Sequence, residues 1–349
     1  MRRVLLPHRL SDDPAPAGAI QELRGASMGT SWSVRLAATL DAARLEELRA
    51  GLQAQLDAVV AEMSHWDPDS HLGRFNRAPA GTWHALPPAF HDVLAYAMEV
   101  GRLSGGAYDP CAGAIVDAWG FGPLDRHDQP GFTAPDAARV RALLAQRAAS
   151  NVVLDTDGRR AFQPGGARLD LSAVAKGYGV DRLAHWLAAR GHRHHLVEVG
   201  GELRGAGVKP DGQPWWVGLE RPIGDTLASS APGEIVLALH GLAVATSGDY
   251  RRYFEHGGRR YSHTIDPRTA MPIANELASV TVVHPHCMAA DAWSTALGVL
   301  GPRHGLALAE RRGLAARFLA RGEHGYTEHL SGAMRAMLED DDDPNEEQQ

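Results

Sequence analysis

Hydrophobic residues recur at helical spacing in one long segment near the start of the chain. After Asp41, leucine, valine and methionine return every three or four positions over 45–63, a spacing typical of an amphipathic helix that packs on a core. A second helix is expected over 87–103, because paired prolines favour a helix start and the glycines from Gly105 onward favour its end. The apolar stripe of the first helix is predicted to face the core.

Shorter segments alternate or are apolar over four to six residues, which is typical of strands. One of them, 31–36, places Trp32, Val34 and Leu36 on the same face. Further strands are expected at 151–154, 195–199, 215–219, 235–239, 242–246 and 279–283. Runs of strands joined by short turns favour an α+β fold with mainly antiparallel sheets and packed helices.

Charge and length change this picture little. The chain has 349 residues and a net charge of −7, but positions 339–349 alone hold seven acids and no base. The rest of the chain is therefore close to neutral, so we expect no nucleic-acid partner. We expect a flexible lead-in over 1–20, one domain over 21–330 with possible subdomains, and an acidic disordered tail over 331–349.

Two further classes are disfavoured. No apolar run approaches the roughly 18 residues of a transmembrane segment, and the basic start of the chain has only three apolar residues before Pro7, too few for a secretory signal. Cys111 and Cys287 are far apart and lack a metal-binding spacing, so no disulfide framework is expected.

The segment 170–181 carries the most chemistry. It is expected to form a short strand that ends in Asp170 and to turn into a helix with Lys176 and Gly177 in its first turn. A carboxylate, a lysine and the free N–H groups of a helix start suit a phosphate-bearing ligand. Acids and small residues also cap helices for purely structural reasons.

A second polar pair lies near the start of a helix predicted at 289–296. Asp291 and Thr295 are four residues apart, so they point the same way on a helix. A carboxylate and a hydroxyl on one face form half of an oxygen-ligand site of the kind that suits magnesium. The structural alternative is that Asp291 only stabilises the helix N-terminus and Thr295 fills space.

These segments, with seven others in the same order, resemble one family, the FAD:protein FMN transferases or ApbE family. The similarity runs from Met28 to Gly301, and no G-x-G-x-x-G of a dinucleotide oxidoreductase follows a strand. The matching landmarks lie at 28–30, 66–70 with 74–76, 106–110 with 119–122, 170–181, 199–202, 245–250, 262–269, 280–282 and 291–295.

The resemblance implies an architecture, a reaction and a metal site. The expected fold is the family's T-fold-related architecture. The expected reaction moves FMN from FAD to a threonine or serine hydroxyl of a target flavoprotein and releases AMP. Family metal ligands correspond to Asp291, Thr295 and a backbone carbonyl near Ala173, with Mg²⁺ the expected ion and manganese or calcium left open. Lys176 would supply a nearby positive charge.

The resemblance also implies the residues that contact FAD. Met28 and Trp66 are expected to flank a ring system, and Asp170 to accept a hydrogen bond from a ribose or ring group. Ala107, Tyr108 and Asp109 are expected to line the nucleotide, and His263 and Thr264 to lie against the flavin.

His263 is the preferred general base, because imidazole suits proton transfer near neutral pH. Asp249 and Asp266 compete for this role. The predicted catalytic set is therefore His263 with Lys176 and Asp170.

Two positions depart from the family pattern. Cys111 stands where the family usually has threonine, which removes one polar contact near the nucleotide. Ala270 stands where glycine is usual, so the loop is expected to differ if the family turn is left-handed.

Two other functions stay open from sequence: a metal-dependent FAD pyrophosphatase that forms FMN and AMP, and a non-catalytic flavin-binding protein. Many family members resemble exported lipoproteins with a cysteine after the signal. This chain shows no such cysteine, which favours the cytoplasm, or the periplasm if an export signal was trimmed.

Overall fold

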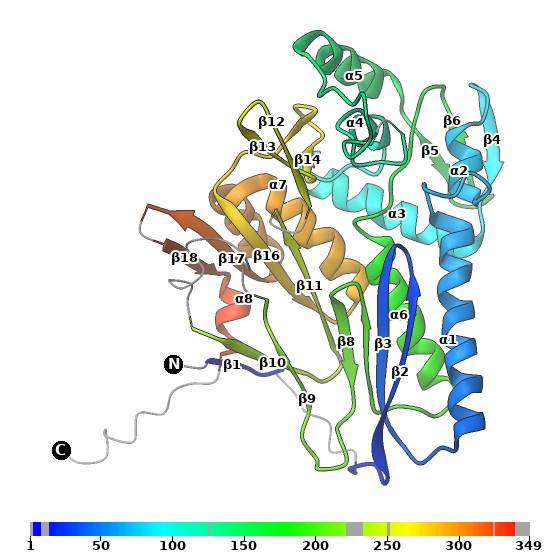
Figure 1. Cartoon of the computed structure of the whole chain (residues 1–349), viewed down its shortest axis with the longest axis vertical. Helices are drawn as coiled ribbons and strands as arrows, with labels where there is room; N and C mark the ends of the chain where they lie inside the picture. The colour runs from blue at the N-terminus through cyan, green and yellow to red at the C-terminus, as the bar shows by residue number, and fades with distance from the viewer. Residues whose placement is uncertain are drawn as a thin grey trace.

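The computed structural model describes residues 3–7, 14–124, 126–220, 233–249, 252–323 and 325–338. Its centre is an eight-stranded sheet of order β18-β17-β16-β11-β8-β7-β3-β2, antiparallel at every pairing (Figure 1). The strands are β2 (Ala19–Ser27), β3 (Thr30–Ala38), β7 (His195–Val199), β8 (Glu202–Ala206), β11 (Leu242–Gly248), β16 (Leu277–His284), β17 (Ala315–Gly322) and β18 (Gly325–Leu330).

The β2–β3 hairpin shows how the sequence sets the register. Trp32, Val34 and Leu36 are fully buried on one face of β3, as their alternation predicts. The two-residue turn consists of Met28 and Gly29, both with positive φ, 53° and 71°. Positive φ at both turn positions matches the twist of the flanking strands, and it fixes Met28 at the end of the hairpin.

Four helices cover one face of the sheet or pack on those that do: α1 (Ala42–Met63), α3 (Pro88–Leu103), α6 (Ala175–Ala188) and α7 (Cys287–Arg312) (Figure 1). α7 packs directly on β11 and β16, and alternate sheet residues such as Ala245, Val280 and Val282 enter its core cluster. α7 breaks at Gly301, whose φ is 76°, immediately before Pro302, because proline cannot continue the hydrogen-bond ladder.

The opposite face carries a smaller layer. A three-stranded sheet of β1 (Arg3–Leu5), β10 (Ile235–Leu239) and β9 (Trp215–Gly218) packs there with α8 (Gly332–Arg335). Leu5 and Met334 are fully buried in this layer. Part of the expected lead-in, β1, and part of the expected tail, α8, are therefore built into the fold. Residues 1–2, 8–13 and 339–349 lie outside the described residues.

Smaller elements gather beyond the end of the main sheet (Figure 1). They are a sheet of β4 (Thr82–Ala85), β6 (Arg160–Gln163) and β5 (Val153–Asp155), the helices α2 (His71–Asn76), α4 (Gly113–Ala118) and α5 (Ala137–Ala149), and two hairpins, β12 (Tyr253–His256) with β13 (Arg259–Ser262) and β14 (Ile265–Asp266) with β15 (Met271–Pro272).

The α+β prediction with mainly antiparallel sheets is confirmed. One local prediction is wrong, because no strand ends in Asp170. Arg168 forms only an isolated bridge with Ala112, and the Asp170 N–H donates to the Pro110 carbonyl at 2.8 Å. The apolar residues Leu169 and Leu171 are buried within a loop rather than on a sheet. Among the described helices none is both long enough and apolar enough to cross a membrane.

Candidate active site

A cavity of about 1130 Å³ lies where the helix layer, the end of β11 and the two hairpins meet. The twelve residues predicted for the site all line it: Met28, Trp66, Ala107, Tyr108, Asp109, Asp170, Ala173, Lys176, His263, Thr264, Asp291 and Thr295. We call residues 170–181 and 287–295 the floor of the active cavity, and residues 252–270 its wall.

The floor is held together by a buried carboxylate between its two helices. Asp181 of α6 accepts the N–H groups of Cys287 and Met288, each at 2.9 Å, and forms an ion pair with Arg204. His286, which precedes α7, forms no capping hydrogen bond with its side chain. Asp181 therefore caps α7 from another helix and sets where the first turns of α7 lie.

Asp291 occupies the junction between α6 and α7. Its Oδ2 accepts the Gly177 N–H at 2.9 Å, and its side chain is buried. Burial raises the pKa of Asp291, and the opposing effects of Lys176 and of the Gly177 N–H partly offset that rise. A Cβ on Gly177 would lie 2.4 Å from the Cys287 carbonyl oxygen, so only glycine allows this close contact.

Lys176 pairs with Glu202, a buried acid at the start of β8. Glu202 also lines the cavity. Sequence reasoning expected Lys176 as a positive charge for the ligand, whereas the structure places it between the carboxylates of Glu202 and Asp291. This arrangement brings two carboxyl groups and a lysine together at the end of the cavity where α6 begins.

Tyr108 contributes a buried polar group beside the cavity. The residue lines the cavity, and its buried hydroxyl has no hydrogen-bond partner within the described ranges. Burial raises the Tyr108 pKa well above its usual value, and the charges of Asp291, Asp170 and Asp109 raise it further. The hydroxyl therefore stays protonated and can donate to a bound group.

The two neighbouring acids already have protein partners. Asp109 pairs with Arg147, whose Nη2 lies 2.9 Å from Oδ1, and it also accepts the Cys111 N–H at 2.9 Å. Asp170 accepts the Ser172 N–H at 2.8 Å and lies 3.5 Å from His65 Nδ1. These contacts orient both carboxylates in the cavity lining.

Trp66 offers a ring face at the cavity rim. It is 46% exposed although it is a large aromatic residue, and the Arg126 guanidinium lies 5.9 Å from its ring centroid. Met28 lies across the floor, where a Cβ on Gly179 would approach its Cε to 3.1 Å. An exposed ring in a concave site is suited to stacking on a flat ligand.

His263 stands on the wall. Its Nδ1 lies 3.0 Å from the Arg252 carbonyl oxygen, so Nδ1 carries the proton and Nε2 is the basic nitrogen. Its ring also meets the edge of Phe121 at 6.3 Å. Burial, opposed by the bond to Arg252, lowers the His263 pKa to about 4, which keeps the imidazole neutral.

The competing acids are both engaged by arginines. Asp249 accepts from Arg321 at 2.7 and 2.9 Å, and Asp266 accepts from Arg268 at 2.8 and 2.9 Å. Each carboxylate uses both oxygens in a bidentate pair with its arginine. The geometry therefore favours His263 over either aspartate as a proton acceptor.

The loop at Ala270 keeps a left-handed turn despite the missing glycine. Ala270 has a φ of 53° and is fully buried, and its carbonyl accepts the Trp119 indole N–H at 2.8 Å. Cys111 is buried, and this burial raises its thiol pKa to about 12. Cys111 and Cys287 are both free thiols.

The residues fit a hard cation of low protein coordination. No group of three or more His, Cys, Asp or Glu side chains arranged for a metal occurs among the described residues, but the predicted set contains only one carboxylate. Asp291, Thr295 and Ala173 line the same cavity. Asp291 Oδ1 accepts no hydrogen bond from the described part of the chain, so an oxygen ligand remains for Mg²⁺.

Sequence reasoning assigned no role to four groups that complete the site. Asp181 and Glu202 cross-link the floor. Phe121 packs on the His263 ring, and Arg126 lies over the Trp66 ring. Three of them lie inside motifs already quoted, at 119–122, 170–181 and 199–202, so their motif positions were the available signal. Arg126 lies outside every motif.

The fold and cavity place this chain among solved flavin transferases. The apo crystal structure of the Pseudomonas stutzeri flavinyl transferase ApbE superposes with a TM-score of 0.80 at 36% identity, covering 91% of this chain and 96% of that one. The flavin transferase ApbE from Vibrio cholerae gives 0.81 at 31% identity, covering 91% and 100%.

Sequence comparison agrees. The FAD:protein FMN transferase of Klebsiella pneumoniae is 36% identical over 93% of this chain and 91% of its own length. The protein of the same name from Haemophilus influenzae is 36% identical over 91% of each. The model of the ApbE family matches residues 28–318. This chain belongs to the ApbE family.

Proposed function

We propose that this enzyme transfers FMN from FAD to a threonine or serine hydroxyl of a target flavoprotein. The hydroxyl oxygen forms a bond to the FMN-side phosphorus, the bond from that phosphorus to the AMP oxygen breaks, and AMP leaves. The hydroxyl proton passes to a base on the enzyme. The observation that carries this proposal is that all twelve residues inferred from the family pattern line one cavity.

The floor would hold the pyrophosphate and its cation. Asp291, Thr295 and the Ala173 carbonyl would hold Mg²⁺, which supplies charge neutralisation on phosphate oxygens during phosphoryl transfer. Lys176 adds a cation that Glu202 orients. The Tyr108 hydroxyl, buried and without a described partner, would donate to an oxygen of the bound nucleotide.

The wall would handle the proton. With Nδ1 hydrogen-bonded to the Arg252 carbonyl, His263 offers Nε2 to the acceptor hydroxyl. The low pKa of His263, about 4, keeps this nitrogen unprotonated near neutral pH. Asp170 would accept a hydrogen bond from FAD. Met28 and Trp66 would contact its rings, and Ala107, Asp109 and Thr264 would line it.

One experiment separates this function from the alternatives. The full chain is incubated with FAD, Mg²⁺ and a candidate acceptor domain, and the acceptor is weighed by mass spectrometry. A mass gain of one FMN less water that is lost without metal supports the transferase. Free FMN and AMP with an unmodified acceptor would indicate pyrophosphatase activity, and intact FAD would indicate a flavin-binding protein.

A further inference from the structure

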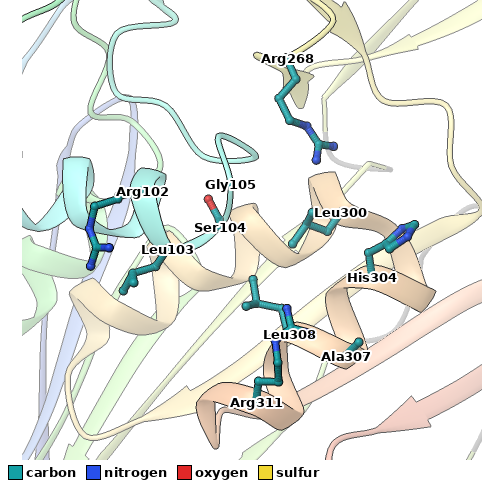
Figure 2. Close-up of a pocket in the computed structure, with 10 residues that line it drawn as sticks. All are labelled: Arg102, Leu103, Ser104, Gly105, Arg268, Leu300, His304, Ala307, Leu308 and Arg311. Carbon is teal, nitrogen blue, oxygen red and sulfur yellow. The ribbon is translucent and has the colours of Figure 1, made fainter.

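A second cavity lies outside the site described above. It measures about 480 Å³ and lies between the end of α3, the β14–β15 turn and the second half of α7 (Figure 2). None of the twelve predicted site residues lines it. We call it the basic cavity, and its lining residues are Arg102, Leu103, Ser104, Gly105, Arg268, Leu300, His304, Ala307, Leu308 and Arg311.

The charge of the basic cavity has one sign. Three arginines and a histidine line it, and its lining within the described ranges includes no aspartate or glutamate. Arg268 extends from the β14–β15 turn towards α7, and Arg311 rises from the last turn of α7 (Figure 2). Cations from separate segments thus surround one depression, which favours a negatively charged occupant.

These cations keep hydrogen-bond donors for a ligand. Arg102 donates hydrogen bonds from Nε and Nη2 to Glu99, at 2.8 and 2.6 Å, and Arg268 donates from the same two atoms to Asp266. The Nη1 of each arginine is not used within the described residues. Arg311 is exposed on α7. Guanidinium groups with spare donors match the oxygens of a carboxylate.

The floor of the basic cavity is apolar. Leu103, Leu300 and Leu308 line it beside the charged groups. His304, Leu308 and Arg311 recur at helical spacing, so they share one face of α7. An apolar base with cationic sides suits a polypeptide segment that carries both acidic and hydrophobic side chains, rather than a lone inorganic ion.

The basic cavity adjoins the active cavity. Pro267 lines the active cavity and the next residue, Arg268, lines the basic one. α7 contributes Thr295 to the active cavity and Leu300 to the basic one, a separation of about 7 Å along a helix. A Cβ on Gly106, between the two, would lie 3.6 Å from Arg268 Cγ. A few extended residues span that distance.

We propose that the basic cavity docks an acidic segment of the acceptor flavoprotein, next to the hydroxyl that receives FMN. This inference rests on the proposed transferase function. A helix C-terminus by itself favours a cation such as Arg102 in the last turn of α3 or Arg311 in the last turn of α7. That effect does not account for Arg268, which comes from the β14–β15 turn and lines the same cavity. Complementary charge at a rim speeds encounter and selects the partner, so the basic cavity raises the rate at which the acceptor protein associates.

Arg311→Glu tests the docking, with Arg303→Glu as its matched control. Both arginines are exposed on α7, but Arg303 does not line the basic cavity. With an acceptor domain that the wild-type chain flavinylates, Arg311→Glu should raise the acceptor KM about tenfold, with kcat and FAD affinity unchanged. Arg303→Glu should change neither, and added salt should weaken the wild-type complex more than the Arg311→Glu complex.

Binding of the fluorescently labelled acceptor domain, measured by anisotropy without FAD, separates the two proposals. If the wild-type chain binds the acceptor through Arg311 without attaching FMN to it, the transferase function is wrong and the docking proposal stands. Equal acceptor affinity for wild type and Arg311→Glu overturns the docking, and so does an equal loss with Arg303→Glu. Inorganic phosphate bound through Arg311, with acceptor affinity unchanged, would make the basic cavity a small-anion site and also overturn it.

Discussion

The floor and the wall of the active cavity are held by different interactions. Buried charges from distant segments fix the floor: Asp181 caps α7, Asp291 accepts the Gly177 N–H, and Lys176 pairs with Glu202. The wall depends mostly on packed rings, which stack in sequence at centroid distances of 5.1–5.3 Å from Trp119 through Tyr261 and Phe254 to His127. Its ion pair, Arg268–Asp266, is partly exposed.

This difference matches the proposed role of each region, which is phosphate and cation binding for the floor and proton transfer for the wall. Phosphate chemistry requires charges at fixed positions, and buried charge-assisted hydrogen bonds are directional and costly to leave unmade. The wall presents one imidazole, and packed rings set its position without further charge. We therefore expect substitutions in the floor to affect both chemistry and stability, and those in the wall to affect mainly one of them.

The largest effect is expected at Asp291. Asp291→Asn keeps the shape of the side chain but removes the charge that would hold the cation, so transfer should fall on the order of a thousandfold. Initial rates of acceptor labelling across a Mg²⁺ titration measure this loss. Thr295→Ser, which retains the hydroxyl, serves as the control and should keep most activity. Near-wild-type transfer by Asp291→Asn would show that the Asp291 carboxylate is not needed for FMN transfer.

His263→Gln should lower kcat by about a hundredfold or more, because it removes the imidazole nitrogen that takes the proton. FAD affinity should change much less, because the other residues that line the cavity are kept. The pH profile is a second readout. The neutral imidazole is the active form and its pKa is about 4, so the wild-type rate should stay flat from pH 8 to about 5 and fall as pH drops through about 4. A fall centred near pH 6.5, or unchanged kcat in the variant, would rule out His263 as the base.

The sequence located the cavity well because most of its lining lies in short contiguous motifs. Contacts across the fold left no local trace. Asp181 and Cys287 are 106 positions apart, and no periodicity indicates that one caps the helix of the other. Lys176 looked free for a ligand because its partner Glu202 comes from another strand.

Among the elements, regular amphipathic patterns gave the right helices, and less regular segments did not. α1 lies where its apolar stripe places it, and α3 lies where the paired prolines and the following glycines place it. The apolar residues before Asp170 predict a strand, but an apolar segment without alternation does not distinguish a strand from a packed loop. β2 was missed because its residues are mostly exposed, and the alanine-rich β17 has weak strand propensity.

Asp181→Asn should destabilise the protein by about 2–3 kcal/mol, since it removes the charge that caps α7 and leaves Arg204 without its partner. Urea unfolding measures this change. Asp266→Asn, at the exposed pair of the wall, is the comparison and should cost about 1 kcal/mol or less. Equal losses at the two positions would mean that the floor is no more tightly cross-linked than the wall.

The smallest effect is expected at Ala270, in the wall. Its left-handed φ of 53° costs alanine roughly 1–2 kcal/mol, and Ala270→Gly would remove that strain. The same change deletes a fully buried methyl that packs with Trp119 and Ile265, worth about 0.8 kcal/mol, and adds backbone entropy to the unfolded chain. These terms nearly cancel, so urea unfolding should shift by about 0.5 kcal/mol or less. An increase in the free energy of unfolding well above 1 kcal/mol would show that the turn stores strain which the packing does not offset. The wall, like the floor, would then hold its residues in place at an energetic cost.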